Sequence, residues 1–395
     1  MKNNWKKIKL SEITDVRDGT HDTPKPSLNG KFLITSKHIK GGKIDISSAY
    51  KISIDDYNFI NKRSKVDQWD ILISMIGTVG EICLVSKYPD FAIKNVGLIK
   101  TKNKHLARYL YYYLKSPIAQ NDIKARLKGT TQQYLSLEEI RNFPIKLPPL
   151  ETQKKIAKML SAFDDKIELN NKINENLEQQ AQAVFKEKII NQCNNRNGKI
   201  GDYCSVKSGF AFKSTWWQDK GIKVIKIKNI NDDNIDIKNC SFVNKDKIPF
   251  AKEFVVKGGD LLIAMTGATI GKFAVVPKTN ETLLVNQRVG KFFLGEEPIN
   301  NLPFLYCTLK EKDITTEIIN KGQGSAQANI SGNDIMTTDC YFPNRDIIQS
   351  FNKICKPLFE NIIMNNYENE QLANLRDTLL PKLMNGEIDV DKINI

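Results

Sequence analysis

The feature that most constrains this chain is an internal repeat, because a duplicated sequence predicts a duplicated fold. Segments of the first half recur in the same order 190 or 195 residues later. The clearest example is Asp-Ile-Leu-Ile-Ser-Met-Ile-Gly at residues 70–77, which matches Asp-Leu-Leu-Ile-Ala-Met-Thr-Gly at residues 260–267. The other matches are 9–12 with 199–202, 15–19 with 205–209, 129–132 with 324–327, Pro148 with Pro343, and Asn170-Asn171 with Asn365-Asn366. Two collinear copies with small insertions predict a tandem duplication.

Each copy has the same expected order of elements. Roughly 145 residues hold short β-rich runs separated by glycine, proline and asparagine, the pattern of strands joined by turns. A proline then precedes a long helix. The clearest runs are residues 32–35, 71–75, 224–227 and 283–285, and residues 106–115 are expected to be helical, with Tyr109, Tyr111, Tyr112 and Tyr113 in the core and at its rim. The sequence therefore predicts an α+β fold: two similar α/β domains separated by two long antiparallel coiled-coil helices.

The predicted boundaries follow from the prolines and from a polar, turn-forming linker at residues 191–198. The two domains are expected at residues 1–147 and 193–342. The helices are expected at residues 148–192 and 343–386, with a tail at residues 387–395.

The two long helices carry apolar residues in a seven-residue repeat, the pattern of helices that pair along their length. In the first helix the repeated positions are Ile156, Phe163, Asn170, Leu177 and Val184, with Leu160, Ile167, Asn174 and Ala181. In the second they are Phe351, Leu358, Asn365, Leu372 and Leu379, flanked by Ile354, Ile362, Leu375 and Leu383. We expect the helices to pair with each other, antiparallel, rather than each to cover its own domain. Asn170 and Asn365 should fix the register, and Pro357 should kink the second helix or delay its start.

The charge of the chain is unevenly distributed. With 59 Lys+Arg against 45 Asp+Glu the net charge is +14, which favours a polyanionic partner such as nucleic acid. Codon bias is the alternative, since only nine of the basic residues are arginine. However, residues 1–150 carry 26 basic and 14 acidic groups, residues 199–345 carry 20 and 16, and residues 346–395 carry 5 and 8. A uniform bias would not leave the last segment acidic, so the excess belongs to the two predicted domains.

Several classes of protein are disfavoured by the sequence. The most apolar stretches, residues 71–85 and 261–276, are too short and too interrupted to span a membrane, and the basic N-terminus lacks the apolar core of a signal peptide. The seven cysteines are dispersed without a Cys-x-x-Cys pair, as expected of free thiols in a reducing cytoplasm.

The motifs of catalysis are missing as well. Residues 267–273 resemble a phosphate-binding loop but have Phe273 where Ser or Thr must reach the metal, so we interpret them, like residues 77–80, as turns at strand ends. The three histidines lack zinc-ligand spacing, and no nucleophile elbow is present. Asp164, Asp165 and Lys166 are expected on a solvated helix face. The chain is not expected to be an enzyme on its own, nor to bind a cofactor or metal.

Two segments of the long helices carry a family resemblance. Residues 147–156 (Leu-Pro-Pro-Leu-Glu-Thr-Gln-Lys-Lys-Ile) with residues 160–170, and residues 375–388 (Leu-Arg-Asp-Thr-Leu-Leu-Pro-Lys-Leu-Met-Asn-Gly-Glu-Ile), are similar to the central and C-terminal conserved regions of type I restriction–modification specificity subunits. The whole chain resembles that family. The resemblance implies two target-recognition domains, each of which reads half of a bipartite, asymmetric sequence in double-stranded DNA.

The resemblance also implies partners. Two methyltransferase subunits would dock on the helices, and two restriction subunits could join them. S-adenosylmethionine would then bind the methyltransferase, and ATP and Mg would bind a restriction subunit. Two alternatives stay open: a self-sufficient restriction–methylation enzyme, which would need catalytic motifs, and a non-catalytic coiled-coil DNA-binding scaffold without split-site recognition.

The residues expected to contact DNA lie in polar loops and beside apolar runs. Gln and Asn can bind adenine, Ser and Thr can bind base or phosphate, and lysines bind phosphates. In the first domain we predict Thr20, His21, Lys25, Lys37, Lys40, Thr130, Thr131, Gln132, Gln133 and Tyr134. In the second we predict Lys213, Trp216, Trp217, Lys226, Lys228, Ser325, Gln327 and Asn329.

These assignments have simpler alternatives. The loops could be ordinary β-turns, and Trp216 and Trp217 could pack instead of stacking on DNA. The four lysines near residues 37–40 and 226–228 are expected to line one sheet face. Arg126 and Arg288 are further candidates for reading guanine, but no repeat spacing supports them.

Overall fold

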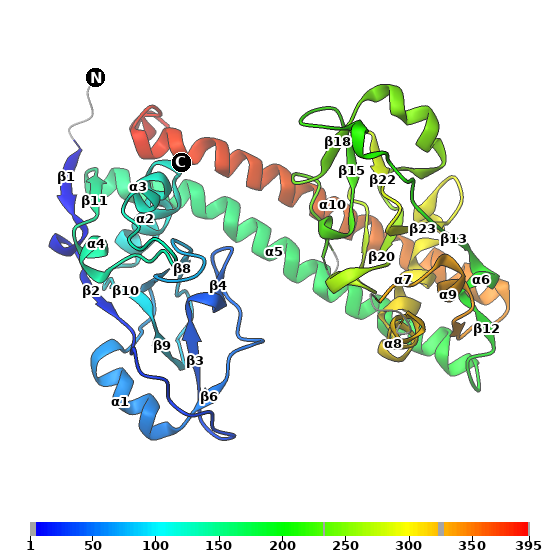
Figure 1. The fold of residues 1–395 in the computed structure, drawn as a ribbon, viewed down its shortest axis with the longest axis horizontal. Helices are drawn as coiled ribbons and strands as arrows, with labels where there is room; N and C mark the ends of the chain where they lie inside the picture. Colours follow the sequence, from blue (N-terminus) through cyan, green and yellow to red (C-terminus); the bar gives the residue numbers. More distant parts are fainter. Residues whose placement is uncertain (1–4, 232–233, 323–327, 394–395) are drawn as a thin grey trace. The chain divides into compact units, whose positions relative to one another are not determined.

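The computed structural model describes residues 5–231, 234–322 and 328–393 (Figure 1). Its contacts divide the chain into two compact units, one formed by the residues before Lys166 with those after Gln371, and one formed by the residues between. Each long helix contributes to both units. The structure confirms the predicted fold class, because the two units repeat one α+β arrangement.

The first unit is built in layers around two facing sheets. A four-stranded antiparallel sheet has the order β2-β10-β7-β8, and a three-stranded sheet has the order β6-β3-β9, in which β3 and β9 are parallel. Leu72 and Leu98 of the first sheet and Ile34 of the second share one core, and Ile60 of α1 covers the far side of the second sheet. The strands are β1 (Lys6–Lys9), β2 (Asp15–Asp18), β3 (Lys31–Thr35), β4 (Ile39–Lys40), β5 (Lys43–Ile44), β6 (Lys51–Ile52), β7 (Ile71–Ser74), β8 (Ile82–Leu84), β9 (Phe91–Lys94), β10 (Val96–Lys100) and β11 (Pro144–Leu147). The helices are α1 (Ile54–Ser64), α2 (Lys104–Lys115), α3 (Pro117–Ala125) and α4 (Leu137–Arg141).

The second unit repeats these layers. The order β13-β23-β20-β21 reproduces the four-stranded sheet, and the sheet β14-β18-β15-β22-β19 contains the parallel pair β15–β22, which corresponds to β3–β9. The strands are β12 (Gly198–Lys199), β13 (Ser205–Ser208), β14 (Trp217–Gln218), β15 (Ile222–Ile225), β16 (Ile230–Asn231), β17 (Asn234–Ile235), β18 (Ser241–Val243), β19 (Val255–Val256), β20 (Leu261–Ala264), β21 (Phe273–Val275), β22 (Leu283–Val285), β23 (Val289–Phe293) and β24 (Asp339–Cys340). The helices are α6 (Ile200–Tyr203), α7 (Leu302–Lys310), α8 (Lys312–Lys321) and α9 (Gly332–Met336).

Local sequence explains why equivalent elements begin at equivalent residues. Ser136 caps α4 by accepting the amide hydrogen of Glu139, and Ser331, 195 residues later, caps α9 by accepting that of Asp334. The predicted strands are confirmed at residues 32–35, 71–74 and 283–285, whereas the strand expected at 224–227 ends at Ile225 in a 3₁₀ turn. The glycines at 77, 80, 267 and 271 all have positive φ and form strand-end turns, as predicted.

The long helices are α5 (Leu150–Lys188) and α10 (Arg345–Asn385). The repeated positions predicted for α5 are all buried or half-buried, so its apolar face is confirmed. The prediction was wrong for Ile354 and Leu375, whose exposed fractions are 46% and 52%. Each lies three residues after a repeated position, whereas the residues four positions after, Cys355 and Arg376, are buried and half-buried.

Two details of these helices differ from expectation. The start of α10 is not delayed by Pro357, because the helix begins at Arg345 and continues past this residue. Asp164 is not on a solvated face, since Tyr112 donates a 2.6 Å hydrogen bond to its carboxylate and Arg376 forms an ion pair with it. Val390, in the tail after α10, is buried.

The remaining sequence-level expectations concern cysteines and membrane spans. All seven cysteines are free thiols, and six of them are buried. Within the part of the chain that the structure describes, no helix is both long and apolar enough to cross a bilayer.

Candidate DNA interface

Backbone hydrogen bonds between the residues that flank the polar loop at 129–133 close its two ends together. Lys128 and Tyr134 exchange two backbone hydrogen bonds of 2.9 Å, and Gly129 has a φ of +93° that other residues rarely adopt. Leu135 donates its amide hydrogen to the carbonyl of Met75 over 2.9 Å, which anchors the loop at the end of β7. The loop therefore presents four exposed polar side chains on a fixed base: Thr130, Thr131, Gln132 and Gln133.

The second unit anchors its loop in the same way. Ile330 donates to the carbonyl of Met265 over 2.9 Å, which reproduces the bond between Leu135 and Met75. A β-bridge joins Asn329 to Thr266 as one joins Tyr134 to Ile76. The predicted contacts Ser325 and Gln327 lie outside the described residues, while Asn329 is exposed at the base of its loop.

A second segment approaches this region in each unit. Thr20 donates to the carbonyl of Ile93 over 3.0 Å and accepts from the amide of Asn95 over 3.1 Å. Gly19, before it, is required, because a Cβ there would lie 2.4 Å from the Ile93 oxygen. In the second unit Phe210 donates to Val285 and accepts from Gln287, each over 2.9 Å, so the arrangement is repeated.

The imidazole ring of His21 contacts two side chains, those of Asp18 and Asn95, which the sequence did not predict as its partners. Its Nε2 lies 2.9 Å from Asp18 Oδ2, and its Nδ1 lies 2.8 Å from Asn95 Oδ1. Asp18 is buried, and its other carboxylate oxygen accepts a 2.8 Å hydrogen bond from Arg63. These contacts orient the exposed imidazole of His21. Lys25, four residues later, is also exposed.

Ser36 joins the segments of the first unit. Its buried hydroxyl accepts the amide hydrogen of Met75 over 3.1 Å and donates to the carbonyl of Asn95 over 2.8 Å. Residues distant in sequence, from the 20–21 segment, the β9–β10 connection and the end of β7, therefore meet at one place. The structure brings Thr20, His21 and the 129–134 loop to this convergence.

The four predicted lysines do not line one sheet face, so that expectation was wrong. Lys37 and Lys228 are exposed in the 3₁₀ turns Ser36–His38 and Ile227–Asn229, and Lys40 is exposed in the short strand β4. The turns form because the side chains at the third turn position accept the preceding amide hydrogens: His38 accepts from Thr35, and Asn229 accepts from Lys226.

The tryptophan pair of the second unit packs rather than standing free. Trp216 and Trp217 are half-buried and contact Phe210, Phe212 and Phe250 in a cluster on the outer face of the β15–β22 sheet. Lysines surround this cluster. Lys226 Nζ lies 3.4 Å above the Trp217 ring, and burial, followed by the charge of Lys228, lowers the pKa of Lys226. Lys213 lies over Trp216 at 5.7 Å.

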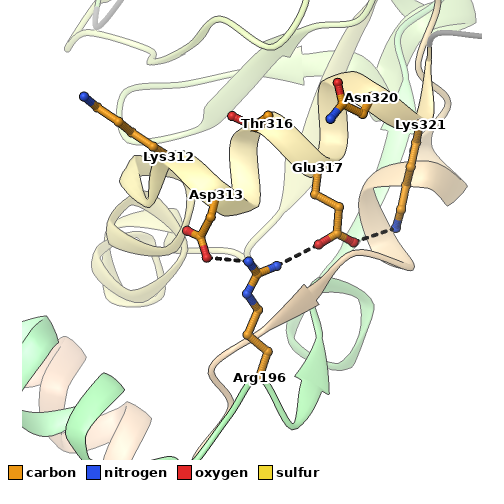
Figure 2. A pocket seen from close by; sticks show the side chains of 7 residues that line it. All are labelled: Arg196, Lys312, Asp313, Thr316, Glu317, Asn320 and Lys321. Carbon is orange, nitrogen blue, oxygen red and sulfur yellow. Dashed lines mark hydrogen bonds and ion pairs between the residues drawn. The ribbon is translucent and has the colours of Figure 1, made fainter.

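Arginines outside these loops have other roles. Arg126 forms ion pairs of 3.1 Å with both Asp122 and Glu139, so its guanidinium is engaged within the protein. Arg196, in the linker after α5, lies between Asp313 and Glu317 of α8 (Figure 2). The open groove of about 650 Å³ around Arg196 is therefore lined by charges that pair with one another. In the residues that the structure describes, no group of three or more His, Cys, Asp or Glu side chains is placed to hold a metal ion.

Sequence reasoning missed the strand connection at Asn95 and, apart from Arg288, the one at residues 286–288. Asn95 adopts a left-handed φ of +52°, a conformation that asparagine tolerates, and an asparagine directly after a β-rich run was the available signal. Its proximity to His21, 74 residues away in sequence, could not be predicted from spacing.

Comparison with known proteins gives one consistent family. A model described as the type I restriction modification DNA specificity domain matches residues 2–179 and 194–374, once in each copy of the repeat. The MjaVIII specificity subunit of Methanocaldococcus jannaschii is 26% identical over 357 residues, which cover 85% of this chain and 82% of that protein. The HindI specificity subunit of Haemophilus influenzae is 24% identical, over 67% of this chain and 73% of its own. The crystal structure of a type I restriction–modification S subunit from M. genitalium shares the fold, with a TM-score of 0.55 at 19% identity over 96% of both chains.

Proposed function

Because the chain belongs to the type I restriction–modification DNA specificity family, we propose that it selects the DNA sequence on which a type I restriction–modification complex acts. Each unit would read one half of a bipartite target. The observation that carries this proposal is that the predicted DNA-contacting segments are joined by hydrogen bonds in both units. The bonds involve Ser36 and Asn95 in the first unit and Met265 and Gln287 in the second.

The two halves of the target are proposed to differ. Equivalent positions carry different side chains: Thr20 corresponds to Phe210, and Tyr134 corresponds to Asn329. Since base edges are distinguished by the donors, acceptors and apolar groups that face them, different side chains select different bases. An asymmetric target of two unlike halves follows, rather than a palindrome.

Base reading and phosphate binding are assigned to different residues. The exposed Gln132 and Gln133 can each bind an adenine edge with two hydrogen bonds, and Thr130 and Thr131 can bind either base or phosphate. Lys25, Lys37, Lys40 and Lys228 are exposed and would bind phosphates. Lys226, whose Nζ lies over the Trp217 ring, would place its ammonium group against the phosphates of the DNA backbone.

The long helices are the proposed docking site for two methyltransferase subunits. Leu169 and Ile173 lie one helical turn apart on α5 with exposed fractions of 52% and 40%. Exposed apolar side chains on a helix that already has a partner face favour a protein partner. The catalytic chemistry is assigned to those partners: S-adenosylmethionine would bind the methyltransferase, and ATP and Mg a restriction subunit where one joins.

Salt-resistant binding separates this proposal from that of a scaffold that holds DNA without reading it. Non-specific binding falls steeply with salt, because it consists of phosphate contacts that release counterions. The chain, purified with its methyltransferase, should retain one duplex selected from a randomised library at a salt concentration that releases bulk genomic DNA. Equal release of every duplex would support the scaffold.

A further inference from the structure

The connection between β22 and β23 differs from its counterpart between β9 and β10. In the first unit a single residue, Asn95, joins the two strands, and its side chain contacts His21. In the second unit three residues join them: Asn286, Gln287 and Arg288. The second unit therefore has an extended connection at the place where its segments converge.

Backbone hydrogen bonds hold this connection on both sides. Gln287 donates to the carbonyl of Phe210 over 2.9 Å, and Arg288 accepts from the amide of Met265 over 3.0 Å. The carbonyl of Met265 in turn accepts from Ile330, which follows the predicted recognition loop. Val289, directly after Arg288, is fully buried. The backbone of Arg288 is thus fixed near Phe210, which precedes the predicted contacts at residues 213–217, and beside Met265, to which Ile330 is bonded.

The guanidinium of Arg288 is the exception among the nine arginines. Each of the other eight binds an acidic side chain, a backbone carbonyl or a serine hydroxyl: Arg17, Arg63, Arg108, Arg126, Arg141, Arg196, Arg345 and Arg376. Arg288 is exposed, and no side-chain hydrogen bond or ion pair joins it to the described residues. Its five donors are available to a ligand.

We propose that Arg288 reads a guanine in the half-site that the second unit binds, an inference that rests on the proposed function. Arginine on a fixed backbone can donate two parallel hydrogen bonds to the O6 and N7 of guanine in the major groove. Asn95 occupies the equivalent place in the first unit, where its side-chain oxygen lies 2.8 Å from His21 Nδ1, so this place carries no guanidinium. The two halves of the target then differ by at least this guanine.

The test is to sequence methylated bases in strains that carry the complex with wild-type chain, Arg288→Ala or Arg288→Lys. Arg345→Ala, which removes an exposed arginine whose contact is the carbonyl of Asp202, is the matched control. Arg288→Ala should reduce discrimination at one guanine of one half-site by about tenfold or more, with the other half unchanged. Arg288→Lys keeps the charge but loses the paired geometry, so it should also relax that position.

The outcomes separate this inference from the proposed function. A wild-type complex without a split motif would refute the function itself. A wild-type split motif that Arg288→Ala leaves intact would overturn only the inference. Equal loss of methylation at every sequence, with an unchanged thermal unfolding midpoint, would assign Arg288 to a phosphate and also overturn base reading.

Discussion

Asn170 of α5 donates a 2.9 Å hydrogen bond from its amide to the Oδ1 of Asn369 of α10. The repeat supplies an equivalent bond, since Asn365 donates to Asn174 over 2.8 Å. Both helices carry the pattern Asn-Asn-x-x-Asn, at residues 170–174 and 365–369. The helices are therefore joined in antiparallel register by a layer of asparagines whose bonds are duplicated with the sequence. The two asparagines expected to fix the register, Asn170 and Asn365, thus both bond across the helix pair.

Removing one asparagine of this layer should destabilise the protein. Asn170→Ala leaves the half-buried Oδ1 of Asn369 without this donor, and an unsatisfied group between the helices costs about 1–3 kcal/mol. The measurement is the urea midpoint of unfolding. Asn361→Ala, at an exposed position of α10, corrects for the helix preference of alanine. Equal midpoints for the two variants would show that the layer does not stabilise the pair.

The Asp164 carboxylate should matter more than its neighbour Asp165. Asp164 accepts from Tyr112 and pairs with Arg376, and burial together with this carboxylate raises the pKa of Tyr112. Asp164→Ala should lower the free energy of unfolding by about 1–3 kcal/mol, because Arg376 loses its half-buried partner. Asp165→Ala, whose carboxylate is mostly exposed, should change thermal stability little. Comparable losses would contradict a specific role for Asp164.

The sequence predicted the duplication, the two long helices and the polar 129–134 loop because each depends on local pattern or on self-similarity. It could not predict the partners of Asp164 or of His21, which come from segments distant in the chain. It also misplaced Leu375, because the half-buried position of that turn is the next residue, Arg376. The candidate interface was predicted as separate segments, and only tertiary hydrogen bonds such as those of Ser36 show that they meet.

The half-buried Lys100 and the buried Lys291 should respond to alkaline pH in opposite ways. Burial lowers the pKa of Lys100, but its hydrogen bonds to Asp67 and Asp70 outweigh burial, and the pKa is raised above 10.5. Its stabilising contribution is complete below pH 10.5 and is lost as the pH rises through the folded pKa. Burial lowers the pKa of Lys291 despite Asp260, so the unfolded chain binds more protons in the window below 10.5. The contribution of Lys291 to the free energy of unfolding therefore rises with pH in that window.

Comparison of wild type with Lys100→Met and Lys291→Met by urea unfolding, at pH values approaching and passing 10.5, checks these signs. The difference in free energy of unfolding between wild type and Lys100→Met should shrink as the pH rises. The free energy of wild type relative to Lys291→Met should instead grow as the pH rises toward 10.5. The same trend for both variants would contradict the assigned environments.

Gln132 should act on the first half-site alone. Gln132→Ala is expected to relax one base of that half by about tenfold, because two hydrogen bonds to an adenine edge are lost. Lys128→Ala is the control, since its side chain pairs with Glu139 and only its backbone closes the loop. Methylation patterns of the two variants provide the measurement. Equal weakening at all sequences would reassign Gln132 to phosphate contact.

The exposed apolar pair on α5 should contribute to assembly. Leu169→Asp places a charge in the proposed methyltransferase contact, so co-purification of the methyltransferase should fall at least tenfold while the thermal midpoint is retained. Leu28→Asp changes a leucine that is 96% exposed outside the helices and should leave assembly unchanged. Assembly that survives Leu169→Asp would place the interface on another surface. Charge reversal at Lys166 is a poorer probe of the methyltransferase contact, because this lysine already forms a 3.3 Å ion pair with Glu368.

The most direct test of the central claim is the sequence motif methylated in a strain that carries this chain with its partners. Two equivalent but non-identical units predict a single motif made of two different halves with an unspecified gap between them. Exchange of the first unit's 129–134 loop for another sequence should alter one half and leave the other unchanged. A continuous motif, or a palindrome with two identical halves, would contradict the account.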